Sequence, residues 1–571
     1  MAKLIVRRPP GAPVNLPVPP VLQRIYAARH VHSVGELNKE LRSLTPFAAL
    51  SQIDRAVDLL QTALQERWRL LIVADLDADG ATSCALTLRA LRALGAAEVS
   101  YVVPNRFTHG YGLTPEIVAV VADQQPHLLI TVDNGISSHE GVRVAQAHGI
   151  KVLITDHHLP GLTLPAADAL VNPNQPGDCF PSKNLAGVGV IFYVLSALRA
   201  RLREAGWFAA QGLAEPNLAQ FLDIVALGTV ADVVTLDHTN RILVEQGLKR
   251  IRAGRCVPGI KALLEVARRP MERATAMDLG FYIGPRLNAA GRLADMSLSI
   301  ECLLTDDPEL AHRLAQRMDD LNRERKTIEN DMRDQALARL QLPLDSSDLP
   351  FGLCLFDPAW HPGVVGILAG RVREQTHRPV IAFALDIDDG QLRGSARSVP
   401  GFHVRDALAT IAARQPGLIS RFGGHAAAAG LSLPAQHLER FQAAFDAETR
   451  QWLSDDDLQG RLLSDGELVP GEFSLDIAQQ VQQGGPWGQG FPEPLFDGVF
   501  EVLSHQIMKE HHLKLRLRPS GTRLTLEAVA FNQVSYFLPG TARLRLAYRL
   551  DVNEWRGESR LQLRIEHLEV A

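Results

Sequence analysis

Three short apolar segments, each followed at once by an aspartate, constrain the fold of this chain more than any other feature. They are LLIVA at 70–74, LLITV at 128–132 and KVLIT at 151–155, and they precede Asp75, Asp133 and Asp156. The stretches between them, at 81–95 and 115–123, carry apolar residues at helical spacing. Alternating strands and helices predict an α/β fold with a doubly wound parallel sheet. Because ligands bind beyond the carboxyl ends of such strands, the three aspartates are candidate site residues.

The segment ADLDADG places Asp75, Asp77 and Asp79 at alternate positions before a glycine. Carboxylates this close repel one another unless a cation binds them, and hard oxygen ligands favour Mg²⁺, Mn²⁺ or Ca²⁺. The segment also resembles the start of a calcium EF-hand loop. However, the twelfth position would be Leu86, which has no carboxylate, and a strand precedes the segment instead of a helix. A solvated loop in which Asp79 only caps the next helix is the remaining alternative.

Further candidate ligands follow along the chain. Asp133 opens the tripeptide DNG, which on its own is more often a turn than a ligand. His157 and His158 follow Asp156; adjacent histidines are commonly surface residues, yet imidazole is also a frequent metal ligand. Asp232 lies in the apolar context LGTVADVV, where an unpaired charge is costly to bury. Because these clusters occur in order along one predicted sheet, we interpret them as one metal site, and its mixed ligands favour Mn²⁺ over Ca²⁺.

Five regions are predicted along the chain. They are an N-terminal extended arm with short helices at 1–45, the main α/β domain at 46–304, a long connecting helix at 305–345, a second, smaller α/β domain at 346–452, and a β-barrel domain at 453–571. The connecting helix has a proline at its first turn and apolar residues at helical spacing. Its predicted length of about 35 residues corresponds to roughly 50 Å.

The C-terminal region contains about five alternating segments and no helical pattern between them, which predicts a small barrel. In LKLRLRP, the cations Lys514, Arg516 and Arg518 fall on one face of the predicted strand and leucines on the other. With aromatic residues such as Tyr548 and Trp555, this face suits a groove for single-stranded nucleic acid. An ordinary barrel with solvated arginines is the alternative.

The composition places further bounds on the function. Hydrophobic residues make up 46% and charged residues 22% of the 571 residues, as in folded globular proteins. The net charge of −5 means that any polyanion must be bound by local basic patches and metal ions. No apolar stretch is long enough to span a membrane, and prolines occupy the place of a signal-peptide core. Five cysteines without a CxxC motif favour a reducing cytosol.

The four clusters DLDADG, VDNGIS, TDHH and GTVAD are similar to the motifs of the DHH phosphoesterase superfamily. Further along, GPRLNAAGR, WHPGVVGILAGRV, RGSARS, GGHAAAAG and GPWGQGFPEP resemble motifs of the RecJ exonucleases within that superfamily. The resemblance covers nearly the whole chain. It implies a DHH catalytic domain, a DHHA1 substrate-binding domain and a C-terminal oligonucleotide-binding (OB) domain. It also implies an exonuclease specific for single-stranded DNA that works in the 5′-to-3′ direction.

The resemblance also assigns roles to individual residues. Matching metal ligands for two Mn²⁺ or Mg²⁺ ions are Asp77, Asp79, Asp133, His157 and Asp232, with Asp133 bridging the ions; Asp75 stands where the pyrophosphatases of the superfamily have a histidine ligand. The predicted catalytic residues are His158, which matches a residue facing the scissile phosphate, and Asp156 beside it. The predicted substrate-binding residues are Arg106, Arg286, Asn288, Arg292, Ser395, Arg397, Gly423, Gly424 and His425. Solvated arginines and a flexible Gly/Ala linker are the alternatives for this last group.

The expected reaction is two-metal hydrolysis of phosphodiesters that releases 5′-mononucleotides during DNA repair and recombination. The resemblance further implies a cytoplasmic, nucleoid-associated monomer that works on single-stranded DNA with a single-strand DNA-binding protein and a RecQ-type helicase, and not at a membrane. One alternative is a phosphodiesterase of short oligonucleotides or cyclic dinucleotides, which would need neither the long helix nor the barrel. Another is a catalytically inactive DNA-binding scaffold, which would not need crowded carboxylates.

Overall fold

The computed structural model describes residues 3–104, 112–339, 349–386, 390–555 and 557–571. The chain divides into two compact units. One, called here the catalytic unit, comprises Pro9–Asn322 and Ser474–Pro494, and the other, the C-terminal unit, comprises Met1–Arg8, Arg323–Phe473 and Leu495–Ala571. The five predicted regions remain a proposal, and the short segment 474–494 belongs by its contacts to the catalytic unit.

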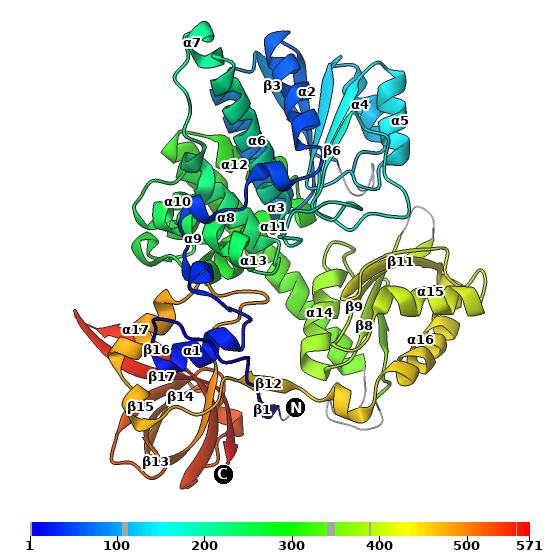
Figure 1. The fold of residues 1–571 in the computed structure, drawn as a ribbon. Helices are drawn as coiled ribbons and strands as arrows, with labels where there is room; N and C mark the ends of the chain where they lie inside the picture. Colours follow the sequence, from blue (N-terminus) through cyan, green and yellow to red (C-terminus); the bar gives the residue numbers. More distant parts are fainter. Residues whose placement is uncertain (1–2, 105–111, 340–348, 387–389, 556) are drawn as a thin grey trace. The chain divides into compact units, whose positions relative to one another are not determined.

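The catalytic unit contains a five-stranded, fully parallel sheet of order β3-β2-β4-β5-β6, which confirms the predicted fold class (Figure 1). The strands are β2 (Arg69–Ala74), β3 (Glu98–Val102), β4 (Leu128–Val132), β5 (Lys151–Thr155) and β6 (Ala169–Val171). Three of them agree with the predicted segments to within a residue. β2, β4 and β5 are recognisable in the sequence because they are buried on both faces and are therefore mostly apolar.

Helices cover both faces of this sheet (Figure 1). Alternate strand residues such as Leu71, Leu129 and Val152 pack against α4 (Pro115–Ala122) and α5 (His139–Ala147) on one face. The opposite face is covered by α2 (Ile53–Gln65), α3 (Ala78–Ala93) and α6 (Gly187–Glu204). The remaining helices of the unit are α1 (Pro20–Ala27), α7 (Trp207–Gln211), α8 (Leu222–Ala231), α9 (His238–Arg252), α10 (Pro258–Val266), the π-helix η6 (Asp278–Ile283), α11 (Gly284–Leu293), α12 (Ser297–Leu304) and α17 (Leu475–Gln483).

The predicted long helix is α13 (Pro308–Arg339), whose 32 residues span roughly 48 Å. It runs from the catalytic unit into the C-terminal unit. There Met332 and Ala336 pack against β7 (Leu353–Phe356), β8 (Val380–Leu385) and α14 (Val365–Thr376).

The second α/β region has a mixed sheet of order β10-β11-β9-β8-β7, completed by β9 (Gln391–Arg397), β10 (Arg421–Gly424) and β11 (Ala428–Pro434). Helices α15 (Val404–Arg414) and α16 (Leu438–Trp452) pack on one face through a core that includes Phe383, Phe441 and Phe445. The opposite face meets α13 and α14 near β7 and β8.

Five strands close into a barrel of order β13-β14-β15-β17-β16, as predicted. They are β13 (Phe496–Met508), β14 (His512–Pro519), β15 (Leu526–Ala530), β16 (Arg543–Trp555) and β17 (Glu558–Val570), and a separate pair joins β1 (Leu4–Arg7) to β12 (Arg461–Ser464). On β14 the leucines face the barrel core and the cations face outward. The expectation that Tyr548 stacks on a nucleobase is wrong. Its side chain is 1% exposed and packs on Phe500 inside the barrel, with ring centroids 5.3 Å apart. The Trp555 side chain lies outside the described residues.

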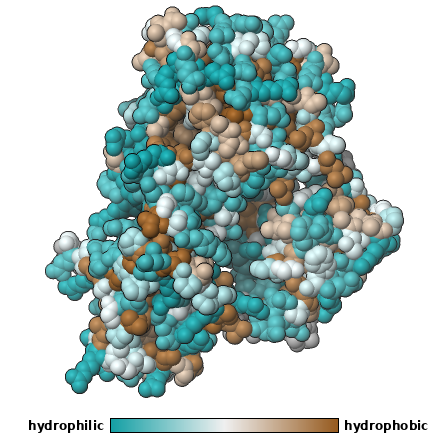
Figure 2. Space-filling model, viewed as in Figure 1, coloured by the Kyte–Doolittle hydropathy of each residue, from teal (hydrophilic) through white to brown (hydrophobic). Residues whose placement is uncertain are grey.

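The visible face of the protein is mostly hydrophilic, with scattered hydrophobic side chains (Figure 2). Among the described helices, none is both long and apolar enough to cross a membrane. The apolar residues are used instead in the sheet, bundle and barrel cores.

Candidate metal centre and phosphate-binding face

The carboxyl ends of three parallel strands meet at one edge of the catalytic sheet. β2, β4 and β5 are in register up to their last residues, Ala74, Val132 and Thr155. The residues that follow are Asp75, Asp133 and Asp156, and all three are buried. The structure thus brings together the aspartates that the strand pattern singled out, because parallel strands end at the same edge of a sheet.

The DLDADG segment turns tightly from β2 into α3. The Asp77 carboxylate caps the helix, since its Oδ1 accepts hydrogen bonds from the backbone N–H groups of Asp79 at 2.9 Å and Gly80 at 3.1 Å. The alternative in which Asp79 is only the cap is therefore wrong. Gly80 is required here because a Cβ atom at this position would lie 2.4 Å from the Asp75 carbonyl oxygen. The turn holds three carboxylates within one short segment.

Asp79 points from α3 toward the first turn of α6. Its carboxylate, which is fully buried, accepts hydrogen bonds from the backbone N–H groups of Gly187 at 2.6 Å and Val188 at 3.0 Å. Burial, together with the neighbouring Asp77, raises the pKa of Asp79 to about 7 in spite of these bonds. A divalent ion would relieve this penalty by binding the ionised form.

Asp133 lies at the centre of the cluster. Its backbone adopts a left-handed φ of +63°, uncommon for a residue other than glycine, and its side chain is 1% exposed. Its Oδ1 lies 3.1 Å from Nε2 of His157, and that nitrogen lies 3.5 Å from Oδ2 of Asp232. Asp232 follows α8 as its C-terminal cap residue. The ends of β4, β5 and α8 therefore place the side chains of Asp133, His157 and Asp232 close together.

The side chains form three overlapping groups whose ligand atoms lie within 4.8 Å of one another. They are Asp75, Asp77 and Asp133; Asp79, His157 and Asp232; and Asp133, His157 and His158. Buried Oδ1 of Asp133 and Nε2 of His157 make no hydrogen bond to the described residues. Such orphaned atoms in a crowd of carboxylates fit a divalent metal centre.

The pKa values of these side chains reflect the close spacing of buried ionisable groups. Burial and the neighbouring carboxylates raise the pKa of Asp133 and of Asp232 well above their ordinary range. Burial, followed by the adjacent His158, lowers the pKa of His157 to about 4, so that its imidazole is neutral as a metal ligand must be.

The two predicted catalytic residues form a tight pair. Oδ1 of Asp156 accepts hydrogen bonds from the backbone N–H groups of His157 and His158, and it lies 2.8 Å from Nδ1 of the His158 ring. Although burial opposes it, the bond to Asp156 raises the pKa of His158 to about 9, and the same bond keeps the pKa of Asp156 low. Oδ2 of Asp156 accepts the backbone N–H of Ile136. This geometry fixes the orientation of the His158 ring, and the catalytic role predicted for Asp156 stays a prediction.

The GPRLNAAGR residues differ in their surroundings. Oδ1 of Asn288 accepts the backbone N–H of Ala78 at 2.8 Å, which places Asn288 beside the carboxylate turn. The Arg286 guanidinium instead contacts Asp319 of α13 at 2.7 Å and the Tyr282 carbonyl. Arg292 is half-buried near the end of α11. Arg106 lies outside the described residues.

The predicted residues of the second sheet share neighbouring strands. Gly423 of β10 pairs with Gly430 of β11, and Gly430 pairs with Ser395 of β9. Arg397 is half-buried two residues further along β9, and its Nη1 donates a hydrogen bond to Oγ of Ser395 at 3.2 Å. A Cβ atom on Gly423 or Gly430 would meet only open space. The small residues therefore leave an accessible floor beside a hydroxyl and a guanidinium.

The two remaining residues of this motif lie at the exposed β10–β11 turn. Gly424 has a φ of +138°, and a Cβ atom there would lie 2.5 Å from the Ala428 carbonyl oxygen. His425 is exposed, and its backbone N–H donates to the same carbonyl. The segment is an ordered hairpin, so the flexible-linker alternative is wrong.

Sequence reasoning missed several residues that shape these sites. Asn174 donates to the His157 carbonyl and Asn172 to the His158 carbonyl, and together they hold the histidine loop. Gly366 of α14 lies so close to β9 that a Cβ atom there would be 2.9 Å from Oγ of Ser395. The NPN tripeptide at 172–174, directly after a strand, was a usable turn signal, whereas nothing local marked Gly366.

The parallel sheet, with carboxylates and an imidazole gathered at its carboxyl edge, has the architecture of the DHH phosphoesterases. A family model described as DHH family, N-terminal domain, matches residues 69–229, one for the DHHA1 domain matches 350–451, and one for the RecJ OB domain matches 464–567. The single-stranded-DNA-specific exonuclease RecJ of Dickeya dadantii (strain 3937) is 53% identical over 568 residues, which are 99% of this chain and 98% of that protein. The chain belongs to the RecJ family.

Solved structures agree with this assignment. The crystal structure of RecJ in complex with Mn²⁺ from Thermus thermophilus matches with a TM-score of 0.79 and 31% identity, over 96% of this chain and 76% of that one. The corresponding Mg²⁺ complex matches with a TM-score of 0.74 and 29% identity, over 96% and 74%. Relatives thus bind the hard divalent ions that the donor set here fits.

The raised carboxylate pKa values predict that metal binding is coupled to proton release. With its pKa near 7, Asp79 is mostly protonated at pH 6 and mostly ionised at pH 8, and the ion binds the ionised form. We expect the affinity for Mn²⁺ to be at least about tenfold lower at pH 6 than at pH 8. Calorimetric titrations in buffers of different ionisation enthalpy measure both the affinity and the protons released. Equal affinity at the two pH values would contradict the prediction.

Proposed function

We propose that this protein is a metal-dependent exonuclease that degrades single-stranded DNA from the 5′ end and releases 5′-mononucleotides in DNA repair and recombination. One observation carries the proposal: overlapping groups of carboxylates and imidazoles, joined through Asp133 and His157, lie at the carboxyl edge of a parallel sheet. Full-length similarity to single-stranded-DNA-specific exonucleases supports the choice of substrate. A complete ligand set argues against an inactive scaffold, and the barrel argues against a small-substrate phosphodiesterase.

Two Mn²⁺ or Mg²⁺ ions would be shared among six of the seven residues of the overlapping groups, all except His158. One ion would be held by Asp79, His157 and Asp232, the other by Asp75 and Asp77, and Asp133 would reach both. When bound, such ions supply positive charge against the phosphodiester and lower the pKa of a water molecule. Asp77 and Asp79 contribute in a second way, because their backbone bonds fix the turn that orients the other carboxylates.

His158 would act on the phosphate itself. Its Nδ1 is held by Asp156, so a contact with the substrate would be made through Nε2. With a pKa near 9, the ring is an imidazolium at neutral pH and would donate a charged hydrogen bond to a phosphate oxygen as negative charge builds up in the transition state. Asp156 keeps the ring oriented and charged, the role expected of a positioning residue.

The face formed by β9, β10 and β11 would recognise the strand terminus. Ser395 and Arg397 offer a hydroxyl and a planar guanidinium, and the glycines beside them permit a phosphate to approach the backbone closely. A terminal 5′-phosphate carries more negative charge than an internal linkage, so this face would favour strand ends. Arg286, Asn288 and Arg292 remain proposed contacts. Arg286 would have to leave or share its ion pair with Asp319 to bind substrate.

The barrel would bind another part of the same strand. Arg516 is exposed on its outer face, while Lys514 and Arg518 lie near Glu527 at 3.2 Å and Glu501 at 3.5 Å. Phosphates could compete with these exposed carboxylates, which contribute little as ion pairs. A single-strand DNA-binding protein and a RecQ-type helicase as partners, a monomeric state and a cytoplasmic, nucleoid-associated location belong to the same proposal.

The direct test is an exonuclease assay with end-labelled oligonucleotides and Mn²⁺. The wild-type protein should shorten single strands from the 5′ end into mononucleotides and leave blunt duplexes intact. Asp133→Asn should lose roughly 10³-fold or more of this activity, because the shared carboxylate no longer binds both ions. Asp123→Asn, which changes an exposed carboxylate after α4, is the matched control. Digestion from the 3′ end would contradict the proposed polarity.

His158→Gln should lower kcat about 10²- to 10³-fold while Mn²⁺ affinity stays within a few-fold of wild type. The pH dependence of activity distinguishes loss of the positive charge on His158 from a structural effect of the substitution. His158 stays protonated up to its raised pKa, and bound cations push that pKa down, so the alkaline fall in wild-type activity should occur at or below pH 9. Asp156→Asn should move this fall to lower pH because it removes the partner that raises the pKa. An unchanged profile would exclude the assigned role, and exposed His148→Gln is the control.

Arg397→Ala should weaken the preference for 5′-phosphorylated over 5′-hydroxyl strands by about tenfold, because one charged hydrogen bond to the terminal phosphate is lost. The ratio of kcat/KM for the two strands is the measurement. The control is Arg405→Ala, which changes an exposed arginine of α15 whose guanidinium lies 3.8 Å from Asp406. A preference that persists unchanged in Arg397→Ala would rule out this terminal-phosphate site.

A further inference from the structure

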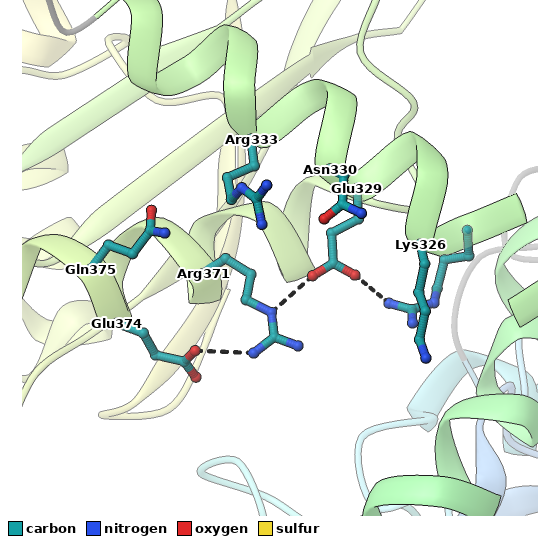
Figure 3. Close-up of a pocket in the computed structure, with 8 residues that line it drawn as sticks. Lys326, Glu329, Asn330, Arg333, Arg371, Glu374 and Gln375 are labelled. Carbon is teal, nitrogen blue, oxygen red and sulfur yellow. Dashed lines mark hydrogen bonds and ion pairs between the residues drawn. The ribbon is translucent and has the colours of Figure 1, made fainter. Parts of the chain in front are cut away.

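A polar groove lies between α13 and α14, within the C-terminal unit (Figure 3). Its volume is about 360 Å³. Arg325, Lys326, Glu329 and Arg333 line it from α13, and Arg371 and Glu374 line it from α14, with the amides of Asn330 and Gln375 between them. Four cations and two carboxylates leave a surplus of positive charge in a protein whose net charge is negative.

A buried carboxylate organises this groove. Glu329 is 6% exposed, and its two oxygens contact Arg325 at 2.5 Å and Arg371 at 2.8 Å (Figure 3). One carboxylate shared by two guanidinium groups leaves the trio with a net positive charge. It also holds the Arg371 side chain across the space between the helices, so that less conformational entropy is lost when an anion binds.

The outer wall of the groove is a row of polar side chains on one face of α13. Lys326, Asn330 and Arg333 are separated by four and three residues, so they follow one another along the helix about 6 Å apart. The exposed acids Glu324 and Asp331 lie about 140° to 160° around the helix from Lys326. These two acids therefore face away from the groove, while Lys326 and Arg333 line it together with the buried Glu329.

We propose that this groove binds the phosphodiester backbone of the DNA strand, as a track in addition to the metal centre and the terminal-phosphate face. This inference rests on the proposed function for the identity of the strand. Successive phosphates along an extended strand have a spacing similar to that of the polar row. The lining holds lysine, arginine and amide groups and no large apolar side chain, which suits sequence-independent phosphate contacts and not a peptide anchored by hydrophobic residues.

The ion pairs within the groove are consistent with this role. Arg333 lies 2.8 Å from Asp334, and Arg371 lies 3.1 Å from Glu374, and both carboxylates are exposed. Such exposed pairs contribute little to stability, so a phosphate can replace the carboxylate at low cost. The Arg325 and Arg371 contacts with buried Glu329 would persist, and they keep the groove open.

The test compares a double variant, Lys326→Ala with Arg333→Ala, with a control of equal charge change, Arg313→Ala with Arg317→Ala, on exposed positions of the same helix. Binding is measured for a long single strand with phosphorothioate 5′ linkages, at several salt concentrations and with Mn²⁺ present. Losing two phosphate contacts should weaken binding roughly tenfold and reduce the slope of log affinity against log salt by about 1.4. The control should behave as wild type.

Hydrolysis of a trinucleotide separates this proposal from the proposed function. The groove variant should cleave it at the wild-type rate, because the metal centre is intact. If the wild-type protein cleaves no single strand, the proposed function is contradicted. The binding measurement still shows whether the groove binds the strand. Unchanged affinity and salt slope in the groove variant would overturn the proposal. An equal loss of affinity in the control variant would also overturn the proposal. So would a groove variant in which only the inhibition by a free 5′-mononucleotide changes, because the groove would then bind an isolated phosphate and not a strand. Lys326→Arg with Arg333→Lys should restore binding.

Discussion

Repulsion among buried carboxylates is the constraint on which the catalytic unit depends. Asp75, Asp77, Asp79, Asp133 and Asp232 converge at one edge of the sheet, and burial opposes the ionisation of the last three. Taking several like charges out of water costs several kcal/mol for each ion unless a counter-charge is present. The rest of the fold must therefore hold the cluster together until divalent ions neutralise it. Metal binding and the final packing of this edge are then one process.

The fold meets that requirement with backbone groups. Two N–H groups at the start of α6 bind Asp79, and two in the first turn of α3 bind Asp77. Close packing makes these contacts possible, since a Cβ atom on Gly187 would lie 2.6 Å from the Asp133 side chain and one on Gly228 would lie 3.0 Å from Oδ1 of Asp79. Backbone donors stabilise the carboxylates without competing for the metal, because they carry only partial positive charge.

Much of this arrangement could be predicted from the sequence because the responsible patterns are local. β2, β4 and β5 are apolar on both faces, and an aspartate follows each one directly. The remaining features depend on tertiary contacts between residues that are far apart in the sequence. Nothing near Tyr548 shows that it points into the barrel, and nothing near Arg286 shows its ion pair with Asp319. Nothing near Asp156 in the sequence shows its four hydrogen-bonding contacts, one of them from the distant Ile136, and its predicted catalytic role stays a prediction.

The chemistry and the recognition of the strand make opposite demands on the protein. Cleavage needs high charge density in one rigid place, which in the proposed mechanism the buried carboxylates, His158 and bound ions would supply. A strand that must advance after each cleavage needs contacts that are individually weak, since tight binding to one register would stop the next step. In the proposed function, the exposed, partly paired cations of α13, α14 and the barrel would satisfy that second demand. Their carboxylate partners would pair with them again when a phosphate leaves, so no cation would be left unpaired. Strand movement would then require the exchange of small energies only.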